Sequence, residues 1–538
     1  MSESRDLILQ NFIDAHVQLV EPLLREAALA EWDLQTTSEM EAQERSAALN
    51  ARIAKIYASE TDFNFLLSVT PSDIEDPLLL RQHTLLLNAY RGSQMSDETI
   101  DAIVELETSI SETFNSFRPQ VNGVAVSDNA IDDVLFHNND SKARKTFWLA
   151  SKEVGAQVSE RLLSLVRMRN TESRRLGFDN YYSMSLTLQE QDEDALFALL
   201  ESLHQESSQI WSEYRTNLDH SLGGRYGVLT ENLRPWHHAN RFFQEPGPGA
   251  ANLDRFFEGV NLEPITAQFF QNIGLPVDDL LEIADLYERP GKCQHAFCLD
   301  VDRKGDVRVL CNNRSDERWM STTLHEFGHA IYDKYLDQDL PYLLREPAHI
   351  LTTEAIALFM GRLTKDAHWL RIYAGVDPAE ADRISAAARH EVQDYLLVFM
   401  RWCFVMCHFE RALYRDPEQD LDGLWWSLVE KYQDINCPVE DRWPGMWAAK
   451  VHLATAPVYY HNYLLGEMTA SQLLCYLQGV VLKESSDTGE ALVTEPVVGA
   501  WLKEALFSPG SRYRWDTWLV RATGEPLNPE YYVRDLRR

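Results

Sequence analysis

The feature that most constrains this chain is a His-Glu-x-x-His pattern, which consists of His325, Glu326 and His329. Residues four apart lie above one another on the same face of an α-helix, so a helix here would direct both imidazoles toward one metal ion. Glu326 would lie about a quarter-turn round, where it can reach a water molecule on the metal. This arrangement is typical of zinc hydrolases, in which two histidines hold the metal and a carboxylate takes the proton of the water.

The residues around this pattern predict a helix. Ser315 and Asp316 are typical N-cap residues, and an apolar stripe with helical spacing follows them. The stripe consists of Trp319, Met320, Leu324, Phe327, Ile331 and Tyr335. Gly328 weakens a helix, but it also leaves room for a neighbouring backbone to approach the metal. The alternative, a helix with two histidines on a polar face and no metal, agrees less well with these surroundings.

A third protein ligand is expected shortly after this helix, and the candidates are Glu346, His349 and Glu354. Glu346 precedes Pro347, which favours an extended loop conformation, and His349 lies in the same irregular approach. Glu354 lies near the start of an apolar helix predicted over 352–360, which can hold a carboxylate still. We therefore expect Glu354 to complete a His2Glu site for one zinc ion (Zn2+) per chain. The alternative is that Glu354 only stabilises the N-terminus of its helix.

Most of the remaining chain is predicted to be α-helical. The hydrophobic fraction of 45% is ample for a core, and apolar residues recur mostly at three- and four-residue spacing. Residues 7–60 are expected to form a hairpin of two long helices. The segments 221–227 and 244–250 are expected to be loops, because both are rich in residues that favour turns.

Charge and cysteine content limit the classes of partner. The formal net charge of −33 argues against a nucleic-acid partner, which requires a basic surface. The first residues lack the pattern of a signal peptide, and no stretch is long and uncharged enough to span a bilayer. The seven cysteines are few and odd in number, which favours a reducing compartment. We therefore expect a cytoplasmic protein with no membrane partner.

Residues 293–311 differ from the helical remainder of the chain. Residues that favour β-strands flank a charged turn at 302–306, which is typical of a β-hairpin. An edge strand beside a zinc helix is a template for an extended peptide, which would add to it through main-chain hydrogen bonds. The alternative is a structural hairpin that caps a helical core.

A second informative segment covers residues 447–467, where a lysine, a histidine and several tyrosines surround a predicted helix start. Tyr460 and Tyr463 are three apart, so they share a helix face and could both donate hydrogen bonds to one ligand. Aromatic spacing alone would instead favour packing in the core.

Together these segments resemble the angiotensin-converting-enzyme family of zinc peptidases, and more distantly the thimet oligopeptidase and oligoendopeptidase F group. The resemblance includes the early Glu31-Trp32 segment, residues 162–178 and nearly all of 293–467. It implies a mainly α, two-lobed helical zinc peptidase with a deep central channel and a small β-hairpin or sheet beside the metal helix. Residues 1–538 would then form a single peptidase domain made of two helical subdomains.

The resemblance also implies a role for each matching residue. His325, His329 and Glu354 would be the zinc ligands, and Glu326 would act as general base and later as general acid. His452 and Tyr463 would hydrogen-bond the oxyanion of the tetrahedral intermediate, a role that preorganised donors perform well in a dry site. The implied substrate-binding residues are His295 and Ala296 on the substrate strand, and Lys450 and Tyr460 at the C-terminal carboxylate of the peptide.

Several positions depart from the family pattern. The glutamine expected in a Trp-Ala-Gln context is replaced, because Trp236 is followed by two histidines and His238 stands in its place. Asn462 and Val429 stand where the animal enzymes have chloride-site arginines, so we expect no chloride activation. Leu358 stands where the family has a carboxylate that orients a ligand histidine.

Cys293 and Cys311 stand at the positions of a disulfide pair in the secreted relatives. Since a reducing compartment disfavours this bond, we expect both residues to be thiols. The sequence therefore predicts the family's hairpin without its covalent link.

The sequence leads to one main hypothesis of function and two alternatives. The main hypothesis is hydrolysis of short peptide substrates with release of C-terminal dipeptides. An oligoendopeptidase, which cuts inside short peptides, would need no terminal carboxylate. A non-catalytic pseudo-peptidase would bind peptides without cutting them, which the retained metal-site residues argue against.

Overall fold

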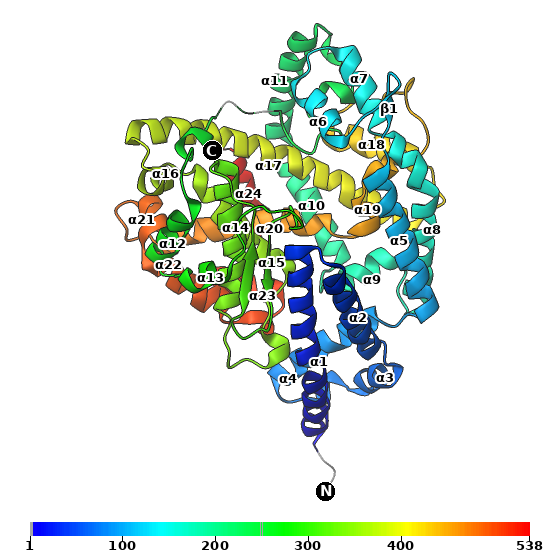
Figure 1. The fold of residues 1–538 in the computed structure, drawn as a ribbon, viewed down its shortest axis with the longest axis vertical. Helices are drawn as coiled ribbons and strands as arrows, with labels where there is room; N and C mark the ends of the chain where they lie inside the picture. The colour runs from blue at the N-terminus through cyan, green and yellow to red at the C-terminus, as the bar shows by residue number, and fades with distance from the viewer. Residues whose placement is uncertain (1–3, 248, 250, 538) are drawn as a thin grey trace. The chain divides into compact units, whose positions relative to one another are not determined.

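The computed structural model describes residues 4–247, 249 and 251–537, and the chain divides into two compact units. Unit 1 consists of Met1–Gln94, Ala251–Ala387 and Leu465–Tyr532. Unit 2 consists of Met95–Ala250, Ala388–Leu464 and Val533–Arg538. Each unit is therefore assembled from three separate stretches, which the colour change along the chain in Figure 1 makes visible.

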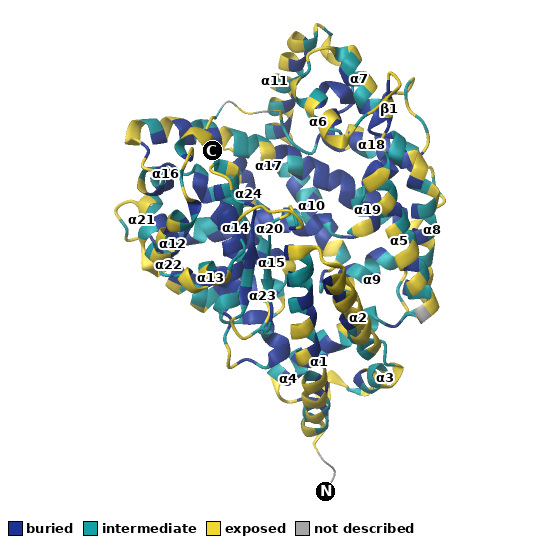
Figure 2. Cartoon of the chain, in the orientation of Figure 1, coloured by how far each residue is buried: buried dark blue, intermediate teal, exposed yellow. Residues whose placement is uncertain are grey.

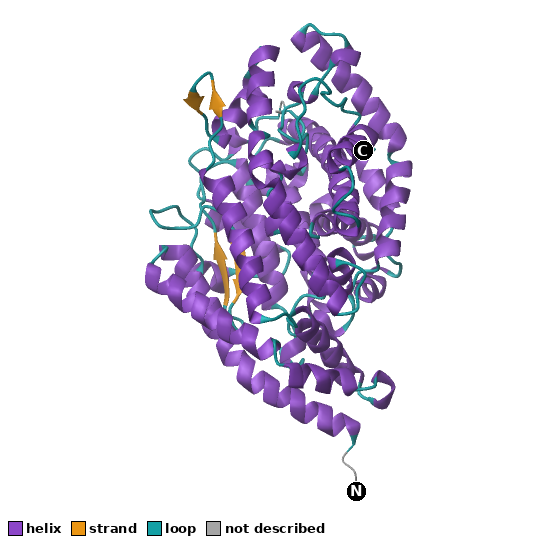
Figure 3. Cartoon of the chain, turned by 90° about the vertical axis from the view of Figure 1, so that its right-hand side faces the viewer, coloured by secondary structure: helices purple, strands orange, loops and turns teal. Residues whose placement is uncertain are grey.

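Helices make up most of both units (Figure 3). Unit 1 contains α1 (Arg5–Thr37), α2 (Met40–Tyr57), α3 (Glu60–Ser68), α4 (Pro77–Gly92), α12 (Leu262–Asn272), α13 (Asp278–Ile283), α14 (Glu317–Lys334), α15 (Ile350–Arg362), α16 (Ala367–Tyr373), α21 (Thr488–Thr494), α22 (Pro496–Trp501) and α23 (Trp515–Thr523). Unit 2 contains α5 (Asp97–Ser116), α6 (Asp128–His137), α7 (Ser141–Ala150), α8 (Glu153–Arg175), α9 (Tyr181–Leu188), α10 (Glu193–Glu206), α11 (Ser208–Tyr226), α18 (Leu421–Gln433) and α19 (His452–Thr455). Three helices carry the chain from one unit into the other: α17 (Pro378–Arg415), α20 (Tyr460–Tyr476) and α24 (Pro529–Leu536).

Short helical turns and two small sheets complete the described structure. The 3-10 helices are η1 (Pro71–Asp73), η2 (Thr230–Asn232), η3 (Pro235–His237), η4 (Asp254–Phe256), η5 (Tyr342–Leu344), η6 (Leu363–Lys365), η7 (Met446–Ala449) and η10 (Gly510–Arg512), and the π-helical turns are η8 (Leu477–Val481) and η9 (Leu502–Phe507). The strands are β1 (Gln120–Val121) and β2 (Val124–Ala125) in unit 2, and β3 (Phe297–Asp300) and β4 (Val307–Leu310) in unit 1. The prediction of a mainly α fold with a small β-hairpin is confirmed.

The predicted hairpin is formed by β3 and β4, which pair antiparallel with Phe297 opposite Leu310. The turn between them includes Arg303 with φ of 57° and Gly305 with φ of 115°. Glycine adopts such a φ without the steric penalty of a Cβ atom. On its other side β4 makes a single parallel bridge to Asp285, whereas β3 has no second partner strand among the described residues.

The predicted hairpin of long helices is confirmed by α1 and α2. Ala27 and Ala30 of α1 pack in one buried cluster with Leu49 of α2. The loop prediction for 221–227 is wrong, because α11 continues through two glycines to Tyr226 and ends at Gly227 with φ of 64°. Residues 244–247 and 249 lie in a loop as predicted, and residues 248 and 250 lie outside the described residues.

In the part of the chain that the structure describes, no helix combines the length and the apolar character needed to cross a membrane.

The closest packing in unit 1 joins α14 and α15, whose residues are largely buried (Figure 2). A Cβ atom on Gly328 of α14 would lie 2.8 Å from the Cα atom of Ala357 on α15. A Cβ atom on Gly361 of α15 would lie 3.2 Å from the carbonyl oxygen of Ser321 on α14. One glycine from each helix therefore allows the two backbones to approach, as expected for Gly328 from the sequence.

Unit 2 contains a buried arginine that holds the segment around α19. Arg169 on α8 donates to the carbonyl oxygen of Ala454 at 2.7 Å and to the hydroxyl of Tyr414 at 2.9 Å. Its guanidinium also pairs with Glu107 at 2.6 Å, although the Arg169 side chain is only 4% exposed. The carboxylate of Glu410 accepts from the backbone N–H of Val458 at 2.8 Å, so buried polar groups fix both α19 and the backbone just after it.

We predict that Gly328→Ala destabilises the protein, because the new methyl group cannot fit against a backbone atom. The expected loss is about 1–3 kcal/mol of unfolding free energy from overpacking. Urea denaturation followed by circular dichroism would measure it. The matched control is Gly224→Ala in α11, where a Cβ atom would meet nothing within 4 Å. Alanine should stabilise that helix by up to about 1 kcal/mol, and equal losses in both variants would contradict the packing argument.

Candidate active site

The His-Glu-x-x-His pattern lies on α14, as the sequence predicts. Asp316 caps this helix, because its carboxylate accepts from the backbone N–H of Trp319 at 2.8 Å. The rings of His325 and His329 lie on one face with their centroids 5.0 Å apart. Both imidazoles can therefore approach a single point beside the helix.

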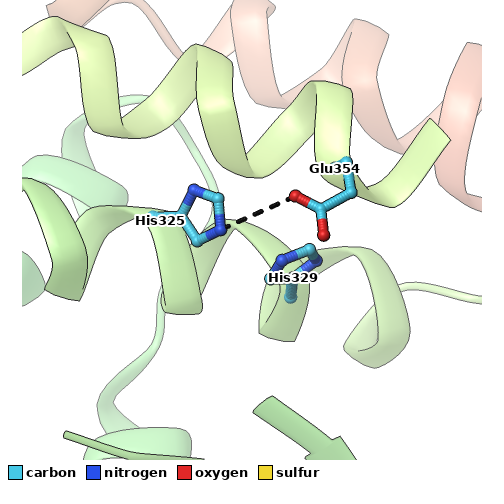
Figure 4. Close-up of side chains that lie close together, drawn as sticks. All are labelled: His325, His329 and Glu354. Atoms are coloured by element: carbon cyan, nitrogen blue, oxygen red, sulfur yellow. Dashed lines mark ion pairs between the residues drawn. The ribbon is translucent and has the colours of Figure 1, made fainter. Parts of the chain in front are cut away.

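Glu354 on α15 brings its carboxylate to the same point (Figure 4). Its Oε2 atom lies 3.8 Å from Nε2 of His325, and one ligand atom from each of the three residues lies within 4.8 Å of the other two. Two imidazole nitrogens and one carboxylate oxygen are the donor set of a common class of catalytic zinc site. The residues present therefore fit a zinc ion.

The two other candidates for the third ligand have different partners. Glu346 forms an ion pair with Arg303 of the hairpin turn. His349 is the N-cap residue of α15, and its Nδ1 atom accepts from the backbone N–H of Leu351 at 3.1 Å. Of the three candidates weighed from the sequence, only Glu354 groups with the two histidines among the described residues.

The orientation of the histidines comes from groups that the sequence analysis did not identify. The hydroxyl of Thr353 lies 2.7 Å from Nδ1 of His329. His325 makes a hydrogen bond with the backbone of Ala357. Leu358 has no polar atom that could orient a ligand histidine, and a hydroxyl and a main-chain group of α15 take over this role. No spacing rule in the sequence points to Thr353.

Burial shifts the pKa of the two histidines and the two glutamates at the proposed metal site. It lowers the pKa of His325 to about 4 and that of His329 to about 3, where the charge of His325 also contributes. It raises the pKa of Glu354 to about 7 and, with the charge of Glu354 adding to it, that of Glu326 to about 8. Neutral imidazoles are the form that binds metals, and a bound cation would favour the ionised carboxylates.

Glu326 is buried beside the histidines and has no place in the ligand group. Burial raises the pKa of the thiols of Cys298 in β3 and of Cys311 just after β4, and the nearby charge of Glu326 contributes to both shifts. Glu326 therefore lies on the side of α14 that contacts the hairpin. His295 and Ala296 precede β3 rather than lying within it; His295 is exposed and Ala296 is half-buried.

All seven cysteines, including Cys293 and Cys311, are thiols in the structure. Asn312 contacts this region, because its side-chain amide donates to the carbonyl oxygen of Cys293 at 2.9 Å. The state of the two thiols in the cell stays a prediction.

The other predicted site residues lie together in unit 2. The Nζ atom of Lys450 is 5.7 Å from the ring centroid of Tyr460. The ring of Tyr460 is 5.2 Å from that of His452 and 5.7 Å from that of Tyr463, measured between centroids. The structure thus places the histidine, the lysine and both tyrosines in one cluster.

Gln244 is a member of this cluster that the sequence analysis missed. The Nζ atom of Lys450 donates to the side-chain oxygen of Gln244 at 2.7 Å. His238, which stands at the position of the family's glutamine, is buried elsewhere, and its carbonyl oxygen accepts from Arg144 at 2.7 Å. Gln244 follows the expected tryptophan by eight residues rather than two, so the family spacing could not reveal it.

Burial also governs the protonation of this cluster. Together with a smaller effect of the nearby charge of Arg241, it lowers the pKa of Lys450 to about 8. It lowers the pKa of His452 to about 4, with a smaller contribution from Lys450. His452 is therefore neutral at pH 7, and no described residue hydrogen-bonds its Nδ1 atom. A neutral imidazole carries no charge but still donates one hydrogen bond through its protonated nitrogen.

Two positions bear on the expected absence of chloride activation. Asn462 is buried, and its side-chain amide donates to Gln189 at 3.0 Å. Val429 contributes an apolar wall to a small aromatic cavity that also contacts Trp425. Neither side chain carries a positive charge, and the effect of chloride stays a prediction.

Comparison with known proteins agrees with this geometry. The profile of the family described as angiotensin-converting enzyme (Peptidase M2) matches residues 4–234 and 250–527. The chain is also 25% identical over 312 residues to Carboxypeptidase 1 of Bacillus subtilis (strain 168), a match that includes 53% of this chain and 59% of that protein. The chain thus spans less than two thirds of the length of this relative. Because the family profile matches far more than half of the chain, the protein belongs to the angiotensin-converting-enzyme family of peptidases.

Proposed function

We propose that this protein is a zinc-dependent peptidase that releases dipeptides from the free C-terminus of short peptides. The observation that carries the proposal is the convergence of His325, His329 and Glu354 within 4.8 Å, with Glu326 beside them on α14. Family membership supports peptide hydrolysis, and the name of the Bacillus subtilis relative, a carboxypeptidase, supports action at a C-terminus.

The chemistry follows from these groups. A zinc ion held by the two histidines and Glu354 would act as a Lewis acid toward the scissile carbonyl group. Glu326 would accept the proton of the attacking water and later give it to the leaving amine. His452 and Tyr463 would donate hydrogen bonds to the oxygen that gains negative charge.

The hairpin offers a binding mode for the peptide backbone. The outer edge of β3 has no partner strand among the described residues, so its main-chain groups can pair with an extended chain. We propose that His295 and Ala296, which lie just before this strand, contact the substrate.

The cluster around Lys450 offers a binding mode for the carboxylate at the end of the peptide. Lys450 would supply the positive charge, and the amide of Gln244 and the hydroxyl of Tyr460 would supply further hydrogen bonds. Lys450 is only 8% exposed, and a buried ammonium group gains most when it meets an opposite charge, because its own burial is unfavourable. This cluster favours a dipeptide-releasing enzyme over an enzyme that ignores the terminal carboxylate.

We predict that Glu326→Gln binds zinc normally but loses most activity, because glutamine keeps the shape of the side chain and cannot take a proton. The expected loss in kcat is about 10²-fold or more. Metal analysis should find about one zinc per chain in both proteins, as expected for a single His2Glu site. After zinc has been removed by chelation, added zinc should restore activity to the parent enzyme but not to the variant. Normal turnover by the variant would refute the assigned base.

We predict that Lys450→Met weakens cleavage of free-acid peptides, because it removes a charge-assisted hydrogen bond of about 1.5–3 kcal/mol. This corresponds to roughly ten- to a hundredfold in kcat/KM. Peptides with an amidated C-terminus should be cleaved equally by both proteins. Mass spectrometry of the products gives the position of the cut. Equal losses for acid and amide substrates, or no loss for either, would support an oligoendopeptidase instead.

We predict that the preference for free-acid over amidated peptides falls as pH rises through about 8, where Lys450 loses its proton. The terminal carboxylate is ionised throughout this range, so only the lysine changes charge. The ratio of the two kcat/KM values between pH 6.5 and 9.5 measures the effect and cancels titrations that act on both substrates. Lys450→Met should give a flat ratio, and a flat ratio in the parent protein would contradict the assignment.

A further inference from the structure

A chamber of about 380 Å³ lies next to Lys450 in unit 2. Four aromatic rings line it, from Phe114, Phe117, Phe136 and Phe242. This volume lies near the lower end of the range of small-ligand sites and is large enough for a long amino-acid side chain. Because Lys450 and His452 are also in its wall, the chamber adjoins the proposed carboxylate site.

Acidic side chains outnumber basic ones in the wall of this chamber. The acidic residues are Asp128 and Asp132 of α6 and Glu245, and the basic residues are Arg241 and Lys450. Arg241 pairs with Asp132 at 2.9 Å and with Asp128 at 3.1 Å. The side chain of Asp128, which lines the chamber, is 60% exposed and uses its Oδ2 atom in the pair with Arg241.

Substrate binding would increase this excess of negative charge. The terminal carboxylate of a peptide would neutralise Lys450, which leaves three carboxylates facing the single charge of Arg241, a net charge of about −2 from these groups. Nearby Lys152 does not line the chamber, and its Nζ atom donates to the carbonyl oxygen of Arg241. His452 adds no charge, because burial lowers its pKa to about 4.

The chamber therefore suits a side chain with a long apolar stem and a positive end. The phenylalanine rings can cover the methylene groups of lysine or arginine, and an aromatic face also attracts a cation. Arg241 and Glu245 lie in residues 235–249, which the family profile does not match. Part of this charge pattern is thus outside the segments that the chain shares with the family.

We propose that this chamber receives the side chain of the C-terminal substrate residue and selects peptides that end in arginine or lysine. This inference rests on the proposed function, in which Lys450 binds the carboxylate of that same residue. Asp128 and Glu245 are the specificity-determining residues, and Asp132 holds Arg241 in place.

The test uses free-acid peptides that are identical except for a last residue of arginine, lysine, leucine, phenylalanine or glutamate. kcat/KM should be about tenfold higher for arginine and lysine than for leucine, and lowest for glutamate, as electrostatic complementarity requires. Added salt should reduce the difference, because the carboxylates are partly exposed. Asp128→Asn and Glu245→Gln should each reduce the ratio of arginine to leucine several-fold, with less effect on the leucine peptide.

The matched control is Asp133→Asn, which removes the same charge from the same helix at a side chain that is 75% exposed and does not line the chamber. Its ratio should equal that of the parent protein. Equal rates for all last residues, or a preference for leucine, phenylalanine or glutamate, would overturn the inference. The amidated arginine peptide separates the two failures: if it is cleaved as well as the free acid, the proposed function fails, and if it is not, only the chamber assignment fails.

Discussion

The metal site depends on the close approach of α14 and α15. His325 and His329 belong to one helix and Glu354 to the other, so the distance between the helices decides whether three ligand atoms can surround one ion. Gly328 and Gly361 permit that distance, and Thr353 and Ala357 of α15 then orient the histidines of α14. The two glycines take no part in the chemistry, but the helix packing that they allow sets the geometry of the metal ligands.

Buried polar groups play the corresponding role in unit 2. Arg169 fixes the backbone within α19, the short helix that begins with His452, and Glu410 fixes the backbone just after it. A four-residue helix has little stability of its own, so its position must come from such tertiary contacts. The two clusters of proposed functional residues are therefore held by different means: helix packing in unit 1 and a hydrogen-bonded network in unit 2.

The sequence predicted features that have a local period or a local turn signal. The metal helix, the β3–β4 hairpin and the choice of Glu354 all follow from spacing and turn chemistry. Thr353 and Gln244 could not be found in this way, because each is identified only by the side chain that meets it in space. The error at 221–227 has a related cause: paired glycines lower helix stability, but the context of α11 overrides that local preference.

The alternation of the chain between the two units has a consequence for folding. Each unit combines stretches from the first, middle and last parts of the sequence, so neither is available as one continuous segment. During synthesis the metal helix emerges well before residues 465–532. Gly466 belongs to this later stretch, and a Cβ atom placed on it would lie 3.3 Å from the Cβ atom of Glu354. Contacts between such distant stretches make folding slow and leave apolar surface exposed until residues 465–532 have been synthesised. Removal of residues 465–532 would take a wall from the metal site rather than a separate domain.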